Sequence, residues 1–303
     1  NRVAGIDGHF KFMRYNRLSF QAVGSMTQTA AEKTDLVPAY TLGLSHSSRH
    51  LQISADYSSV PADFEASLGF FRRKDIQALS VRAGYALLPM NEWIVSIRPS
   101  VEYRRITDFN GTLTDDEYSL SCFLSGWRQT YIWVLYSSGL ERYEGIDFYQ
   151  KSLMLGLGSE PLSWLGAEIR YNFGDGIYYD YNPYLGYKKG LEMGIILKPF
   201  SNLNVSYSLG NDRFYRGKGG ETVYKINVIS QRINYQVTRP LSLRLITDYN
   251  DYYSMLYVSA LLSYEYRPGT VFYLGVDDNR EKDVLGFFRG TGRYYFIKFS
   301  YWW

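Results

Sequence analysis

Apolar residues stand at every second position in about seventeen short segments that follow one another along the chain. In one of them, Leu241, Leu243 and Leu245 alternate with Ser242 and Arg244. A period of two over about ten residues is typical of a β-strand with two unlike faces. Because no helix-like segment separates these strands, the pattern predicts an all-β fold. We expect a transmembrane antiparallel up-and-down β-barrel, with about seventeen strands in this chain.

The connections between the predicted strands alternate in length. Tight turns are expected around residues 15–17, 48–50, 90–92, 126–128, 160–163, 200–202, 238–240 and 267–269. Longer polar links are expected at 27–36, 59–69, 108–113, 143–147, 174–184, 211–221 and 277–290, with a weaker one near 250–252. Short periplasmic turns and long external loops are the outer-membrane arrangement. A soluble β-sandwich alternates too, but the many charges on the polar faces favour a barrel with a wet interior.

The C-terminal segment, Tyr295 to Trp303, is rich in aromatic residues, as is the last strand of bacterial outer-membrane barrels. If this end lies in the periplasm, each preceding strand crosses the membrane in the opposite direction to the next. Counting back about seventeen strands then places the start of the first strand, about Val3 to Met13, at the extracellular side. Such barrels normally have an even number of strands with both ends in the periplasm. We therefore expect the C-terminal part of a longer chain, whose complete barrel has about eighteen strands or more. A miscounted hairpin within residues 223–237 is the alternative.

Composition is compatible with this fold. The 303 residues are 46% hydrophobic and 17% aromatic, and tyrosine, at 30 residues, is unusually frequent. A transmembrane helix needs about 20 consecutive apolar residues, and the apolar runs here are far shorter. This length requirement does not apply to a barrel, because the inner face of its strands is polar. Tyrosine is common at the two rims of such barrels. The strand pattern covers residues 1–303 without a linker, which indicates a single domain.

Charge and cysteine content exclude some functions. The net charge is +3, and the 33 basic residues form no cluster of the kind that nucleic-acid binding needs. Cys122 is the only cysteine, so no internal disulfide can form, and it shares a face with Leu120 and Leu124. We read it as a small lipid-facing residue. The expected partners are therefore outer-membrane lipid and lipopolysaccharide, with glycan or a plug protein as further candidates and no nucleic acid.

Several short stretches of the chain resemble those of a known family. They are Asn1 to Gly8, Asp63-Phe64 with Leu68-Gly69-Phe70, Arg142 to Phe148, Gly174 to Asp180 and Pro268 to Gly275. In these stretches the chain resembles an uncharacterised family of large outer-membrane proteins. Its members place an N-terminal module similar to family-nine carbohydrate-binding domains ahead of a C-terminal barrel. The resemblance covers the barrel part only. It implies a barrel fold and a link to glycans, and it implies no reaction.

Charged residues on the predicted inner face are the main candidates for function. Rings of charged side chains set the selectivity of wide pores. Alternatively, arginine–carboxylate pairs only brace the interior. Because both signs are present, the pattern predicts neither an anion nor a cation preference. The candidates are Arg82, Arg98, Glu102, Arg104, Glu168, Arg170, Glu192, Lys198, Arg244, Asp248 and Lys298.

The predicted loop from Gly174 to Tyr184 is the densest aromatic and acidic stretch. Tyrosine rings beside carboxylate and amide groups suit stacking on sugars and hydrogen bonds to their hydroxyl groups. Alternatively, the loop packs on itself or narrows the interior. Its oxygen atoms are of the kind that calcium prefers, but we predict no metal site and no cofactor. The ligand candidates are Asp175, Tyr178, Tyr179, Asp180 and Asn182.

An enzymatic barrel would need a nucleophile and a base, and the chain has only three histidines, His9, His46 and His50. His9 shares a predicted strand face with Asp7, a spacing that allows an acid–base pair. Ordinary polarity of the inner face explains it as well, and we predict no catalytic residue. The expected function is a channel or transporter for small, glycan-related solutes. The alternative is a structural or anchoring barrel that displays a carbohydrate-binding module or holds a partner protein.

Overall fold

The structure is a computed structural model and describes residues 1–28, 35–67, 69, 73–283 and 285–302. Seventeen antiparallel up-and-down strands belong to one sheet, and the first nine are β1 (Arg2–Phe12), β2 (Asn16–Met26), β3 (Val37–Ser47), β4 (Leu51–Val60), β5 (Ile76–Tyr85), β6 (Ile94–Thr107), β7 (Leu113–Gly126), β8 (Tyr131–Tyr143) and β9 (Ile146–Leu162). The others are β10 (Leu165–Tyr178), β11 (Tyr184–Phe200), β12 (Leu203–Tyr215), β13 (Thr222–Gln236), β14 (Leu241–Asn250), β15 (Met255–Arg267), β16 (Thr270–Lys282) and β17 (Phe288–Ser300). The short 3-10 helix η1 (Trp127–Gln129) lies between β7 and β8. The described part of the chain contains no helix long and apolar enough to cross a membrane.

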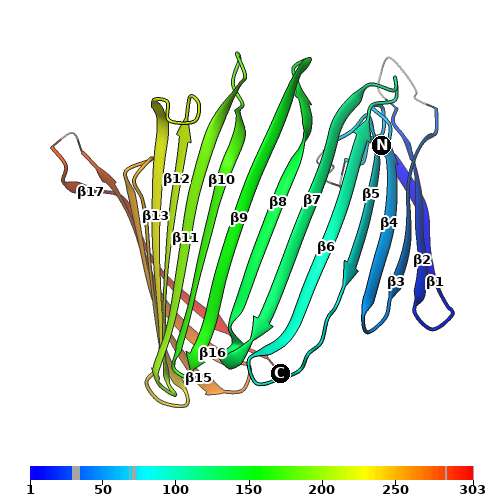
Figure 1. Cartoon of the computed structure of the whole chain (residues 1–303). Coiled ribbons are helices and arrows are strands. Elements are labelled where there is room, and N and C mark those ends of the chain that lie inside the picture. Colours follow the sequence, from blue (N-terminus) through cyan, green and yellow to red (C-terminus); the bar gives the residue numbers. More distant parts are fainter. Residues whose placement is uncertain (29–34, 68, 70–72, 284, 303) are drawn as a thin grey trace. The chain divides into compact units, whose positions relative to one another are not determined.

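Strands that follow one another in sequence pair with each other, as β1 pairs with β2 and β15 with β16 (Figure 1). This confirms the all-β fold and the strand count. The pairing of β13 with β14 runs without a register shift from Val228 to Gln236. Residues 223–237 therefore contain no hidden hairpin. Closure of the sheet into a barrel is not detected among the described residues, so closure stays a prediction.

The chain divides into two compact units. Unit 1 comprises Asn1–Ser125, Trp133–Leu153 and Asp175–Leu185, and unit 2 comprises Gly126–Ile132, Met154–Gly174 and Gly186–Trp303. Because successive strands run in opposite directions, the links after even-numbered strands lie at one end of each unit. We call this the loop end and the opposite end the turn end. The single-domain organisation stays a prediction.

The strands of unit 1 have one polar and one apolar face. Arg82 of β5 lies opposite Glu102 of β6, whereas the neighbouring Val81 lies opposite Tyr103. Residues that lie directly opposite each other on antiparallel strands point to the same side of the sheet. The side that carries Arg82 and Glu102 is therefore the polar face, and the side that carries Val81 and Tyr103 is the apolar face.

Unit 2 repeats this division. Arg244 of β14 lies opposite Asn234 of β13, and one residue along, Leu245 lies opposite Ile233. The same alternation continues into β16 and β17, where Lys298 lies opposite Tyr273 on the polar face. The period of two in the sequence therefore predicts the two faces correctly.

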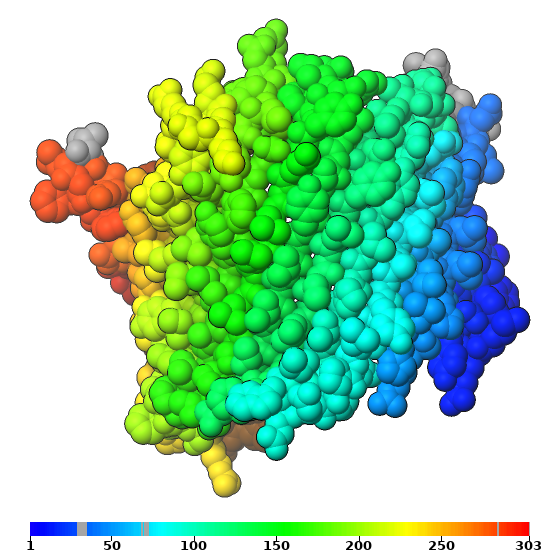
Figure 2. Space-filling model, viewed as in Figure 1, coloured from blue at the N-terminus to red at the C-terminus, as the bar shows by residue number. Residues whose placement is uncertain are grey.

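Several predicted loops are shorter than expected because the strands continue into them. Only Glu144 and Gly145 join β8 to β9, and their positive φ angles of 49° and 76° fit a two-residue hairpin turn. The predicted loop 174–184 is reduced to residues 179–183, since β10 extends to Tyr178. Figure 2 shows the tip of this hairpin projecting from the strands. At the turn end, by contrast, residues 86–93 form a longer link than predicted.

A few sequence predictions fall outside the described residues. They concern residues 29–34 of the predicted link 27–36, Leu68 and Phe70 of the family resemblance, and Trp303 of the C-terminal segment.

Candidate functional site

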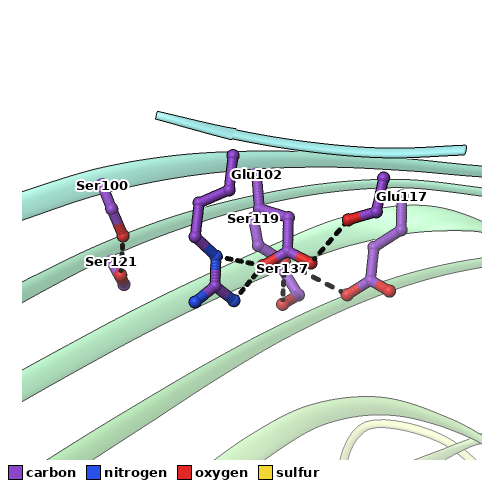
Figure 3. Close-up of polar contacts among 8 residues, drawn as sticks. Ser100, Glu102, Glu117, Ser119, Ser121 and Ser137 are labelled. Carbon is purple, nitrogen blue, oxygen red and sulfur yellow. Dashed lines mark hydrogen bonds and ion pairs between the residues drawn. The ribbon is translucent and has the colours of Figure 1, made fainter. Parts of the chain in front are cut away.

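A ladder of polar contacts crosses the polar face of unit 1 (Figure 3). Arg82 Nε donates a hydrogen bond to Glu102 Oε2 at 2.9 Å, and Ser80 Oγ donates to Glu102 Oε1 at 3.3 Å. On β6 and β7, the hydroxyl groups of Ser100 and Ser121 lie 2.7 Å apart. The structure thus brings the predicted pair Arg82 and Glu102 together, and this pair braces neighbouring strands.

A cavity of about 190 Å³ follows on the polar face, towards the loop end of unit 1. It is lined by Arg104 and by the carboxylates of Asp115, Glu117, Glu141 and Asp175. Four carboxylates against one arginine make this cavity acidic. It suits a cationic or hydroxyl-rich solute better than an anionic one.

Part of this acidic lining is already bound to neighbouring groups. Arg73 Nη1 donates to Asp115 Oδ2 at 2.6 Å, and Gln150 Nε2 donates to Glu141 Oε2 at 3.1 Å. Ser119 Oγ lies 3.2 Å from Glu117 Oε1 and 2.9 Å from the hydroxyl of Ser137. The carboxylates are therefore held in place rather than freely rotating.

Tyr179, in the β10–β11 link, contacts one of the carboxylates that line this cavity. Its hydroxyl donates to Glu141 Oε1 at 2.8 Å, and its ring meets that of Tyr143 edge-on at 5.1 Å. Partial burial and the hydrogen bond to Glu141 raise the pKa of Tyr179 to about 12. The phenol therefore stays protonated and keeps donating its hydrogen bond at any physiological pH.

We expect this hydrogen bond to persist until the pH rises through about 12. The phenolate absorbance of the wild type minus that of Tyr179→Phe isolates this one group during alkaline titration. In a Glu141→Gln background, the pKa of Tyr179 should fall towards its ordinary value of about 10, because the carboxylate no longer opposes ionisation. Identical titration midpoints in the two backgrounds would contradict the contact.

The most unexpected feature of unit 1 is the segment 61–67, which follows β4 and lies on the polar face. Phe64 is fully buried there, against Ala39 and Val60 and beside Val23 and Ile76. The register places Val23 and Ala39 opposite each other on the side that also carries the polar residues of β2 and β3. The segment thus covers the loop end of this face instead of extending away from the strands.

Hydrogen bonds hold the segment 61–67 in this position. The backbone N–H of Glu65 donates to Ser25 Oγ at 3.1 Å, and Asn1 Nδ2 donates to the Glu65 carbonyl oxygen at 3.0 Å. Thr27 Oγ1 donates to Glu65 Oε2 at 3.2 Å. The residue pattern of this stretch predicts only a polar link between two strands. A lone aromatic residue among small residues in Pro61 to Ala66 was the available signal.

The polar face of unit 2 carries a second group of the predicted residues. Arg170 Nη1 donates to Glu192 Oε2 at 2.8 Å and lies 4.0 Å from Glu168. Glu168 in turn accepts a hydrogen bond of 3.0 Å from the Tyr131 hydroxyl. These three predicted charges therefore form one braced cluster.

A larger cavity, of about 730 Å³, lies at the turn end of unit 2. Lys198 and Arg244 line it together with the amides of Asn202, Asn204, Asn234 and Gln236. No carboxylate is among its lining residues in the described part of the chain. Arg244 Nε donates to Asn234 Oδ1 at 3.1 Å. The cavity is positive and rich in amide groups, which suits an anionic or hydroxyl-rich solute.

The remaining predicted residues are more scattered. Asp248 and Lys298 occupy polar-face positions opposite Tyr257 and Tyr273, and Arg98 alternates with the apolar-face residue Ile97 on β6. The loop candidates do not form one site. Asp175 and Tyr178 belong to β10, Tyr178 stacks on Tyr184 at 5.2 Å, and Asp180 and Asn182 are exposed in the link.

Two of the histidines contact neutral groups on neighbouring segments. His46 Nδ1 lies 3.0 Å from Asn16 Oδ1, and His50 Nδ1 lies 2.8 Å from the carbonyl oxygen of Ala86. Within the described residues, no group of three or more His, Cys, Asp and Glu side chains could hold a metal ion. No protein-family model and no curated protein matches this chain.

Proposed function

We propose that the sheet forms the wall of a transmembrane β-barrel in the outer membrane of a Gram-negative bacterium, and that its polar face lines a passage for small solutes. The apolar face supports the membrane placement. Leu42 and Leu44 on β3 are each 49% exposed, and Val101 on β6 is 44% exposed. Large apolar surfaces are unfavourable in water but are stable against lipid tails.

The observation that carries the passage is the segment 61–67 on the polar face. If the polar face were covered along its whole length, apolar residues would be needed along that whole length. Here the short segment 61–67 covers only the loop end of the polar face in unit 1. The rest of the polar face of unit 1 retains charged side chains and the acidic cavity, and unit 2 has its own cavity lined by Lys198 and Arg244. Such an arrangement supports a wet passage that is narrowed locally, as a selective channel requires.

The two cavities point to polar, hydroxyl-rich solutes. Carboxylate, amide and tyrosine groups dominate the cavity of unit 1 and its surroundings, and amides with two cations dominate that of unit 2. Sugars offer many hydroxyl groups that both kinds of lining can bind. We therefore propose glycans or their breakdown products as the solute class, in keeping with the family resemblance.

Planar-bilayer recording of the purified protein tests this function. Stable channels with salt-dependent current would support it. A folded protein that conducts nothing would refute it and favour the anchoring barrel, whose braced interior or bound partner blocks passage.

We expect Arg244→Glu and Arg98→Glu to shift the selectivity towards cations. Neither arginine makes an ion pair with a described residue, so each reversal changes the charge that a passing ion meets. A unit charge at about 4 Å in water changes the energy of an ion by about 1 kcal/mol, and a reversal is a change of two charges, so we expect about 2 kcal/mol, or up to about thirtyfold in permeability. Reversal potentials in a salt gradient measure the shift. Arg239→Glu, in the exposed link 237–240, is the matched control, and an equal shift there would contradict the assignment.

A further inference from the structure

Three basic residues stand side by side on the apolar face of unit 2, at its loop end. Lys189 of β11 lies directly opposite Arg213 of β12, and Arg213 lies directly opposite Lys225 of β13. All three side chains are exposed. We call them the basic row. Like charges directly opposite on antiparallel strands repel each other and destabilise the sheet, so this arrangement needs a reason.

The protein itself does not neutralise the basic row. Among the described residues, no ion pair includes Lys189, Arg213 or Lys225. Lys189 Nζ instead lies 5.8 Å from the ring centre of Tyr187 and 5.5 Å from that of Tyr215. These aromatic contacts orient the lysine without cancelling its charge.

Hydrogen bonds around the row also leave its charge in place. Arg213 Nε donates to Asn211 Oδ1 at 3.1 Å, which uses a neutral acceptor. The carboxylate of Asp251, in the link after β14, accepts hydrogen bonds from the backbone and side chain of Asn227. The carboxylate of Asp251 is therefore engaged with Asn227.

Other basic residues on the apolar face of unit 2 are neutralised by a carboxylate. Arg280 and Arg293, on β16 and β17, both donate to Asp278 Oδ2, at 2.7 Å and 2.9 Å. On the polar face beside the row, Lys188 lies 3.7 Å from Asp212. The basic row differs from these residues, because no described carboxylate forms an ion pair with it.

An apolar band lies directly below the row. Leu197 stands eight positions after Lys189 on β11, a length of about 27 Å along the strand at about 3.4 Å per residue. Because strands of such barrels are tilted by about 35–45°, this length spans about 20 Å of membrane thickness. The apolar band of outer-membrane barrels is about 25 Å tall. The row thus lies at one border of this band, with Tyr187 and Tyr215 beside it. The apolar residues of the band include Met193, Ile195, Leu197, Leu209, Val205, Ile229 and Ile233.

We propose that Lys189, Arg213 and Lys225 bind the phosphate group of a phosphorylated lipid headgroup, whose acyl chains cover the apolar band below. The site rests on the proposed membrane placement. Three neighbouring cations on adjacent strands can neutralise the roughly two negative charges of a phosphate monoester. The apolar band below them suits the lipid tails. Lipopolysaccharide, the phosphorylated lipid of the outer leaflet, is the occupant.

Native mass spectrometry of the full chain in detergent tests the site with purified lipid A as the probe. We expect lipid A to remain bound to the wild-type protein in the mass spectrum. In the triple variant Lys189→Gln, Arg213→Gln, Lys225→Gln, its apparent affinity should fall at least about tenfold. Arg213→Gln alone should show an intermediate loss. Arg239→Gln, which removes the same charge from an exposed link at the turn end, should leave binding within about twofold.

Three results would overturn the site. One is equal binding of lipid A that lacks its phosphates, because the lipid tails alone would then explain it. Another is inorganic phosphate displacing lipid A at equal concentration, which would assign the row to free phosphate. The third is an equal loss in Arg239→Gln. Circular dichroism of each variant verifies that the strands still form.

Conductance separates this site from the proposed passage. A protein that conducts but binds lipid A without regard to phosphate refutes the site alone. A silent protein whose lipid A binding depends on the basic row refutes the passage alone. The triple variant should conduct like the wild type, since the row lies on the apolar face.

Discussion

Replacing Phe64 by alanine is expected to release the segment 61–67 from the polar face and to raise single-channel conductance. The ring is fully buried against Ala39 and Val60, and deleting a buried phenylalanine costs about 3 kcal/mol or more. The hydrogen bonds of Glu65 to Ser25 and Asn1 are solvent-exposed or partly so, and each contributes about 1 kcal/mol. They cannot hold the segment in place without the ring.

Single-channel recording and limited proteolysis measure this release together. The variant should show larger open-channel current and faster cleavage within residues 61–67. Phe109→Ala is the matched control, because Phe109 also lies in a link at the loop end of unit 1 but is 44% exposed. If both variants behave like the wild type in both assays, the segment does not narrow a passage.

The second large effect is expected from Gly139→Ala on β8, which should destabilise the folded protein by about 3 kcal/mol. A Cβ atom at this position would lie 2.5 Å from the carbonyl oxygen of Asp116 and 2.8 Å from the Cα of Glu117. Both atoms belong to the backbone of β7, so no side-chain rotation relieves the clash. The strands must separate, and the acidic cavity that Gly139 lines changes shape with them.

Gly210→Ala on β12 is the matched control, since its Cβ would find no atom closer than 4.0 Å. Alanine is more favourable than glycine within a strand by about 0.5–1 kcal/mol, so this variant should be slightly more stable. Reversible unfolding by urea in detergent micelles measures both. Equal midpoints for the two variants would show that β7 and β8 do not approach as closely as described.

The alternation of residue types carries enough information to predict the strands and their faces. In residues 241–249 the leucines and the charged residues separate by position alone, because successive side chains of a strand point to opposite sides. The strand count and the tight turns follow from the same pattern. The N-terminal limits of the links do not, because polar residues such as Asp175 and Asn211 continue a hairpin as readily as they form a loop.

The candidate site was predictable only in part. Arg82, Glu102, Arg170 and Glu192 were recognised as polar-face charges, but their pairing depends on how neighbouring strands are aligned. Glu141 and Asp115 are just as polar in the sequence, and only the cavity that they share marks them. The role of Phe64 was not predictable, because a buried ring in a loop needs a surface that other strands provide.

An all-β sheet of up-and-down strands with unlike faces follows from the residue pattern alone, since period two is a local property of each strand. Which residues meet depends on the tertiary structure. The basic row of Lys189, Arg213 and Lys225 shows the reason: these residues lie 12 to 36 positions apart in the chain. Only the register of three strands, set by backbone hydrogen bonds and hairpin geometry, places them side by side.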